Sequence, residues 1–241
     1  MELLERAEKT GYKVAILTVD VPIQFRRAKD NRNGFTVPFN LGFKQFIDFA
    51  THPNWSISTL LSGIPKPMNY ETSKRGNKFV RNESRGATDC DTLKRIREKW
   101  KGKLIIKGVM SSEDALKIKS EGADAIQVSN HGGRQFDSAT SSIEVLPIIR
   151  NALGKDFPII FDSGIRGGSD IVRALALGAD FTMIGRPLMY GIGADGAKGL
   201  KRVVDIIKDE LSTALGLVGL TDIKDISSDI IAERFIRDFK Y

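Results

Sequence analysis

Residues 157–186 read FPIIFDSGIRGGSDIVRALALGADFTMIGR, and this stretch decides the fold. It holds two short apolar runs, at residues 157–162 and 181–184, with helix-like sequence at 169–177 between them. Each apolar run lacks polar alternation and ends in polar or glycine residues, which is typical of a strand buried on both faces. The stretch therefore predicts a strand–helix–strand unit of a parallel sheet.

The same pattern recurs along the chain. We expect three more strands, at residues 14–20, 104–107 and 125–129, each followed by helical sequence, which makes five βα units. No glycine-rich dinucleotide turn follows the first strand, and this disfavours a Rossmann fold. The sequence predicts an α/β fold of the TIM (β/α)8-barrel type, incomplete here because five strands cannot close an eight-stranded barrel.

The composition is that of a globular protein, with 41% hydrophobic and 28% charged residues in a chain of 241. No apolar run approaches the roughly 18 residues of a membrane span. The first residues lack the pattern of a signal peptide. Cys90 is the single cysteine, which excludes an internal disulfide and suits a reducing compartment. We therefore expect a cytoplasmic protein.

The basic excess lies in one segment. Residues 21–100 hold 15 Lys+Arg against 7 Asp+Glu, whereas the other residues hold 22 against 23. This segment also contains five of the eight prolines and lacks sustained periodicity. We predict one domain spanning residues 1–241, with a loop insertion at about 21–100 that meets an anionic surface or ligand. Nucleic-acid binding is disfavoured because the positive charge is not accompanied by a known nucleic-acid recognition motif.

The last two predicted strands end in sequences that suit an anion. One is followed by Asp162-Ser-Gly-Ile-Arg166 and the other by Gly185-Arg186. Loops after the final strands of a barrel commonly bind phosphate, because glycines let backbone N–H groups approach and arginines add charge. The alternative is a pair of ordinary turn glycines with solvated arginines.

A second group of residues suits proton chemistry. His131 follows a buried strand and is a candidate to take a proton near neutral pH. Arg134 is a candidate to hold a carboxylate, and Asp20 to stabilise a protonated His131. Lys107, at another strand end, could stabilise an anion, form a Schiff base or make a structural ion pair. For His131 the alternative is a structural hydrogen bond.

These residues resemble the FMN-dependent α-hydroxy-acid dehydrogenases and oxidases, especially the membrane-associated bacterial L-lactate and mandelate dehydrogenases. The matching stretches, in chain order, are Leu17–Pro22, Arg26–Arg27, Ile106–Gly108, Ser129–Asp137, Asp162–Arg166 and Ile184–Arg186. In the family's order the five strands correspond to strands 4–8 of the barrel. The resemblance thus implies that strands 1–3 are absent, as in a gene fragment or one piece of a split protein.

The resemblance also implies roles for individual residues. His131 would accept the proton of the α-hydroxyl with Asp20 as its partner, and Arg27 and Arg134 would hold the substrate carboxylate. The cofactor FMN would contact Thr18, Lys107, Ser129, Asp162, Gly164, Arg166, Gly185 and Arg186. No metal is expected.

The implied reaction is oxidation of an L-2-hydroxy acid, L-lactate foremost, to the 2-oxo acid, with hydride transfer to flavin N5. Electrons would pass to quinone or cytochrome. One alternative is an oxidase that uses oxygen, and another is an inactive fragment or complementing subunit. The 21–100 loop would place the protein peripherally on the inner face of the cell membrane, unless it is a lid packed on the barrel. A complete protein is expected to form a homo-oligomer.

Overall fold

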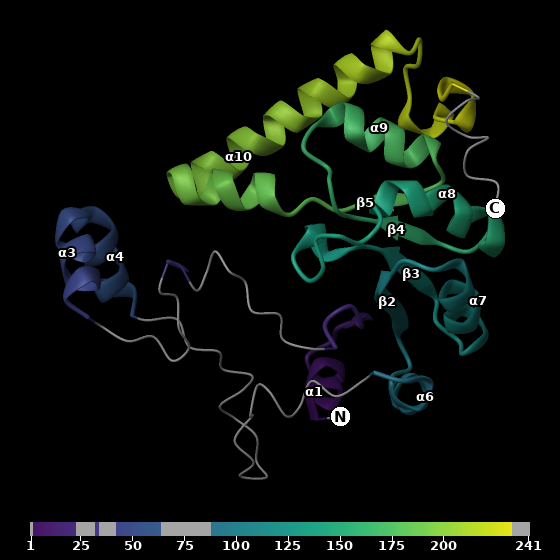
Figure 1. Cartoon of the computed structure of the whole chain (residues 1–241), viewed down its shortest axis with the longest axis horizontal. Coiled ribbons are helices and arrows are strands. Elements are labelled where there is room, and N and C mark those ends of the chain that lie inside the picture. The colour runs from purple at the N-terminus through teal and green to yellow at the C-terminus, as the bar shows by residue number, and fades with distance from the viewer. Residues whose placement is uncertain (1, 23–31, 34–41, 64–87, 233–241) are drawn as a thin grey trace. The chain divides into compact units, whose positions relative to one another are not determined.

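The computed structural model describes residues 2–22, 32–33, 42–63 and 88–232 (Figure 1). The chain divides into two compact units, one combining residues 1–22 with 87–241 and the other comprising residues 23–86. The second unit falls within the predicted insertion. Arg27, the predicted ligand of a carboxylate, lies outside the described residues.

The first unit is built on a five-stranded sheet in which every neighbouring pair is parallel and the strands follow chain order. The strands are β1 Val14–Thr18, β2 Lys103–Val109, β3 Ala125–Val128, β4 Ile159–Phe161 and β5 Phe181–Thr182. Within the described part of the chain, β1 and β5 each pair with one neighbour, so the sheet does not close. The predicted parallel βα architecture is confirmed as an incomplete α/β fold.

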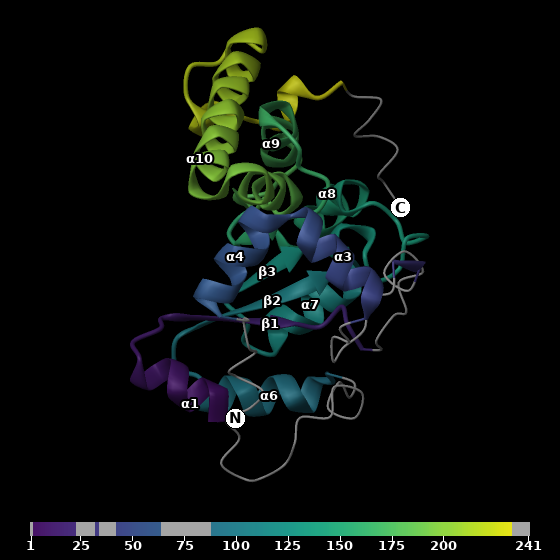
Figure 2. The same cartoon turned by 90° about the vertical axis from the view of Figure 1, so that its left-hand side faces the viewer.

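Helices follow the strands as the sequence predicts. These helices are α6 Cys90–Lys99, α7 Ser112–Ser120, α8 Ser142–Leu153, α9 Gly168–Ala176 and α10 Arg186–Leu217, and one more helix, α1 Glu2–Lys9, precedes β1. Figure 2 shows α1 and α6 side by side, and Lys99 of α6 pairs with Glu5 of α1. The sequence predicts helix clearly only from residue 198, whereas α10 begins at Arg186 and bends at Asp195 and Gly196.

The two faces of the sheet differ in chemistry. Register partners Leu17, Ile106, Ile126 and Ile159 lie on the face that packs against the helices, where the last three are almost fully buried. The opposite face carries a second row of register partners, Thr18, Lys107, Gln127, Ile160 and Phe181. We call these the helix face and the polar face. The helix face holds the hydrophobic core, and Phe181 on the polar face is 63% exposed.

Asp124 forms a cluster of hydrogen bonds at the amino-terminal edge of the sheet. Its carboxylate accepts hydrogen bonds from Arg97 Nη1 at 2.9 Å, Lys103 Nζ at 2.8 Å and Leu104 N at 2.9 Å. Burial raises the pKa of this carboxyl, but the hydrogen bonds and positive charges around it prevail and hold the pKa below its usual value. Asp124 thereby joins α6 and β2 to the start of β3.

The described part of the second unit is mainly a helical pair, α3 Phe43–Thr51 and α4 Pro53–Ser62. The Phe49 and Trp55 rings lie 5.4 Å apart, which joins the two helices. Large apolar side chains remain exposed, namely Phe43, Phe46, Ile47, Trp55, Ile57, Leu60 and Leu61. Among the described ranges, no helix combines the length and apolarity needed to cross a membrane.

Candidate active site at the carboxyl ends of the strands

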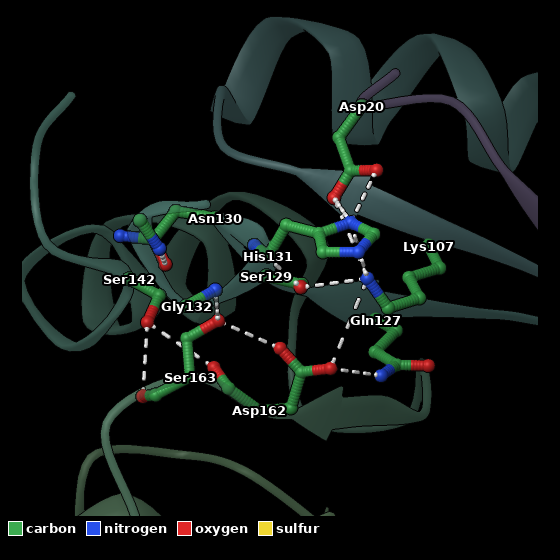
Figure 3. A network of polar contacts seen from close by, with 11 residues as sticks. Asp20, Lys107, Gln127, Ser129, Asn130, His131, Gly132, Ser142, Asp162 and Ser163 are labelled. Atoms are coloured by element: carbon green, nitrogen blue, oxygen red, sulfur yellow. Dashed lines mark hydrogen bonds and ion pairs between the residues drawn. The ribbon is translucent and has the colours of Figure 1, made fainter. Parts of the chain in front are cut away.

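The turn after β3 carries the candidate base. His131, Gly132 and Gly133 all have positive φ angles, of 57°, 66° and 71°. Positive φ is uncommon for a residue other than glycine, and such strain gathers at functional sites. The turn is held because Ser129 Oγ accepts a hydrogen bond from His131 N at 3.1 Å. The His131 imidazole is thereby fixed beside the ends of the neighbouring strands (Figure 3).

Asp20, two residues past β1, pairs with His131. Nδ1 of the imidazole lies 3.0 and 3.1 Å from the two carboxylate oxygens. Gly108 makes room for this pair, because a Cβ at this residue would lie 2.5 Å from the Asp20 Cβ. A carboxylate on Nδ1 orients the ring and leaves Nε2 available to accept a proton.

Lys107 lies between two carboxylates. Its Nζ donates to Ser129 Oγ at 3.0 Å and to Asp20 Oδ2 at 3.4 Å, and it lies 3.9 Å from Asp162 Oδ2. Its Nζ is also 3.5 Å from His131 Nδ1. These surroundings suit an electrostatic role for the ammonium.

Asp162, just after β4, extends this network. Its Oδ2 accepts from Gln127 Nε2 at 2.6 Å and its Oδ1 from Ser163 Oγ at 2.8 Å. Ser163 Oγ in turn accepts from Gly132 N at 3.0 Å. The ends of β1, β2, β3 and β4 are therefore joined by one continuous set of polar contacts, which Figure 3 shows.

The starts of α9 and α10 differ as anion sites. At α9, Gly168 N donates to Glu210 Oε2 at 3.0 Å, and Asp170 Oδ2 accepts from Arg166 N at 2.9 Å. Carboxylates of the chain thus already occupy the start of α9. At α10, Gly185 faces open space within the described part of the chain, since a Cβ there would meet none of its atoms within 4 Å. The start of α10 is the better placed of the two for an external phosphate.

The structure brings most of the predicted site residues together. Asp20, Lys107, Ser129, His131 and Asp162 belong to the network, and Arg186 reaches it by donating to Gly132 O at 2.7 Å. Thr18 is the register partner of Lys107. Gly164, Arg166 and Gly185 lie beyond β4 and β5, and Arg134 is exposed on the turn after His131. The chemical roles of all these residues stay predictions.

Sequence reasoning missed two polar residues of the network, Gln127 and Ser163, and also Ser142, whose hydroxyl donates to the main-chain carbonyls of Asp162 and Ser163 rather than to the side chains of the network. Gln127 and Ser142 are nearly fully buried, and Ser142 Oγ donates to Asp162 O at 3.1 Å. The available signal for Gln127 is an amide inside the apolar run of residues 125–128. Across the described residues, no group of His, Cys, Asp and Glu side chains could hold a metal ion.

The parallel βα units place a carboxylate–imidazole pair and an ammonium at the carboxyl ends of the strands, which is where α/β folds of the barrel type hold their active sites. The sequence profile described as FMN-dependent dehydrogenase matches residues 1–233, and the chain belongs to this family.

Individual relatives agree with this assignment. The chain is 39% identical to L-lactate dehydrogenase of Pectobacterium atrosepticum over 238 residues, which covers 95% of this chain and 61% of the relative. A crystal structure of the monotopic membrane protein (S)-mandelate dehydrogenase superposes with a TM-score of 0.87 at 36% identity, covering 95% and 62%. Mandelate oxidase superposes with a TM-score of 0.70 at 30% identity, covering 92% and 57%. The chain thus spans about three fifths of the length of these relatives.

FMN is the cofactor of this family, and the residues at the carboxyl ends of the strands fit it. Gly164 and Gly185 both border open space, where a Cβ would meet no atom of the described residues within 4 Å. Arg186 is partly buried at the start of α10, where its guanidinium could pair with a phosphate. Lys107 offers a cation for an anionic ring system, and Asp162 offers an acceptor for hydroxyl groups.

Proposed function

We propose that this chain carries the catalytic pair and the phosphate-binding end of an enzyme that oxidises an L-2-hydroxy acid to the 2-oxo acid. L-lactate is the foremost substrate, in keeping with the L-lactate dehydrogenase relative. The observation that carries the proposal is the Asp20–His131 contact of 3.0 Å with Lys107 Nζ beside it. A base with its orienting carboxylate and a nearby cation is what removal of a hydroxyl proton and stabilisation of an anion require.

In this proposal His131 Nε2 accepts the proton of the α-hydroxyl, and Asp20 stabilises the resulting imidazolium. Arg134 holds the substrate carboxylate, with Arg27 as the second predicted ligand. Bound FMN supplies the electron-pair acceptor. Lys107 stabilises the negative charge of the reduced ring, and Gly185 with Arg186 holds the phosphate.

The first experiment mixes the purified chain with FMN and L-lactate and follows reduction of a dye. We expect flavin-dependent dye reduction that exceeds hydrogen peroxide formation, because the proposed acceptors are quinone or cytochrome. Peroxide at the same rate as pyruvate would instead favour the oxidase alternative, for which mandelate oxidase is the structural neighbour. A chain that binds FMN without oxidising any 2-hydroxy acid would overturn the proposal and support a non-catalytic or complementing piece.

We also propose that α3 and α4 bind an anionic membrane surface. Their exposed apolar side chains belong to the basic segment of residues 21–100, and such a mixture suits interfacial contact. The structural relative named as a monotopic membrane protein supports this location.

The membrane proposal is tested by co-sedimentation with vesicles that contain phosphatidylglycerol. Leu61→Ser removes a side chain that is 85% exposed on α4, and Leu217→Ser is a matched control, 83% exposed on α10. We expect Leu61→Ser, but not Leu217→Ser, to weaken partitioning several-fold. Equal partitioning of both variants and the unmodified chain would reject α4 as the contact.

A further inference from the structure

Gln127 is a buried amide on β3 beneath the polar network. Its side chain is almost entirely enclosed, with the residue 2% exposed. Nε2 donates to Asp162 Oδ2 at 2.6 Å, whereas Oε1 has no hydrogen-bond partner among the residues that the structure describes. Figure 3 shows the amide nitrogen directed at Asp162 and the oxygen directed away.

An amide with one unpaired atom is a poor choice for stability. Burying a polar atom without a partner is unfavourable, and an apolar side chain of similar size would avoid the loss. Stability therefore does not explain why the strand carries glutamine here. The hydrogen bond to Asp162 is the contact that distinguishes Gln127 from a leucine.

That hydrogen bond bears on the position of Lys107. The Lys107 ammonium has Asp20 on one side, at 3.4 Å, and Asp162 on the other, at 3.9 Å. The Asp162 oxygen nearest to Lys107 is the same Oδ2 that accepts from Gln127. Two donors, one neutral and one charged, thus lie near the same oxygen, and the neutral donor makes the shorter contact.

We propose that Gln127 is a positioning residue that keeps Lys107 with the Asp20–His131 pair. By occupying Asp162 Oδ2, the amide satisfies this carboxylate without the ammonium. Lys107 then remains hydrogen-bonded to Ser129 and Asp20, beside the candidate base. The consequence for flavin chemistry rests on the proposed function, whereas the positioning itself belongs to the protein alone.

The positioning is tested on the chain without cofactor, by crystal structures of variants. In Gln127→Leu we expect Lys107 Nζ to move into hydrogen-bonding contact with Asp162 and away from Asp20. Ser142→Ala is the matched control, because it removes a buried donor to the Asp162 main-chain carbonyl and leaves the carboxylate untouched. Lys107 unmoved in Gln127→Leu, or moved equally in both variants, would overturn the proposal.

A double-variant cycle separates positioning from packing. Asp162→Asn removes the charge that would attract the ammonium, so Gln127→Leu in that background should leave Lys107 on Asp20. If Gln127 were only a packing residue, its replacement would shift Lys107 equally with and without the Asp162 charge. That outcome would contradict the proposal.

The consequence is tested with FMN bound, using sulfite as the probe, because sulfite adds to flavin N5 and a nearby cation stabilises the adduct. We expect Gln127→Leu to weaken sulfite binding about tenfold, the effect of moving one charge by a few ångströms. Ser142→Ala should leave sulfite affinity within about twofold, well inside the 1.4 kcal/mol that a tenfold change represents. Unchanged sulfite affinity in Gln127→Leu would contradict the link to flavin. If the unmodified chain takes up no FMN, the proposed function fails, and the crystal structures without cofactor still decide the positioning.

Discussion

The helix face and the polar face of the same sheet are put to different uses. On the helix face Ile106, Ile126 and Ile159 are at most 1% exposed and belong to the hydrophobic core. On the polar face Lys107 and Gln127 are joined through the Asp162 carboxylate, and the buried Oε1 of Gln127 has no hydrogen-bond partner among the described residues. The alternation of side chains along a strand allows this division. We infer that one face carries stability and that the other carries the proposed chemistry at some expense of stability.

The largest predicted difference between the two faces is in the turnover of the proposed reaction. We expect His131→Asn to lower the rate of L-lactate oxidation by about 10²–10⁴-fold, the usual contribution of a positioned base. The free energy of unfolding should change little, since the imidazole is part-exposed. Steady-state dye reduction and urea unfolding measure the two quantities. His52→Asn, at the other histidine, is the control, and equal losses in both variants would contradict the assignment.

The second effect is on stability. Ile126→Ala should reduce the free energy of unfolding by about 2–5 kcal/mol, because it opens a cavity in the core. Ile16→Ala, on the opposite face and 46% exposed, should cost less than about 1 kcal/mol. Urea denaturation of both variants compares the faces directly. Similar losses of unfolding free energy at the two positions would contradict the proposal that only the helix face carries stability.

The third effect couples backbone conformation to the catalytic pair. Gly108→Ala should destabilise the protein by about 1–3 kcal/mol, since φ is +101° and the new Cβ would displace Asp20. Gly154→Ala is the control, because φ is +79° there but a Cβ would meet no atom within 4 Å in the ranges that the structure describes. Turnover should fall in Gly108→Ala and persist in Gly154→Ala. Loss of turnover in both would mean that backbone strain alone is responsible.

The fourth effect lies at the amino-terminal edge of the sheet, away from the site. The pKa of Asp124 is lowered in the folded protein, so its stabilising contribution is present above the unfolded pKa of about 4 and is lost as the pH falls through the folded pKa. Asp124→Asn should cost about 1–3 kcal/mol at pH 7 and flatten the acid limb of the stability curve. Thermal unfolding between pH 7 and pH 3 measures this, and an unchanged acid limb would show that other carboxylates dominate.

Much of the fold could be predicted because each strand is a short apolar run that ends in polar residues. The early part of α10 was not predicted because Gly191, Gly193 and Gly196 weaken a helical pattern, and the tertiary fold overrides this local preference. The strand ends of a parallel sheet meet at one edge, and for this reason Asp20, Lys107 and His131 could be grouped from sequence.

The contacts made by Gln127 and Ser163 could not be predicted in the same way. Period-two alternation puts Gln127 on the same face as Ser129, but it does not identify a partner 35 residues away. The link from Ser163 to Gly132 likewise depends on two turns with positive φ, at Ser163 and His131. Side-chain pairing across strands is set by the tertiary structure, which a single sequence does not display.

The central claim is that the carboxyl edge of the polar face holds FMN through the start of α10. A fluorescence titration of the full chain with FMN tests this most directly. We predict saturable quenching by the unmodified chain, a loss of affinity of at least about tenfold in Arg186→Met, where a charge-assisted contact to phosphate is removed, and a smaller loss in Arg166→Met. Absence of quenching, or equal affinity in Arg186→Met and the unmodified chain, would contradict the account.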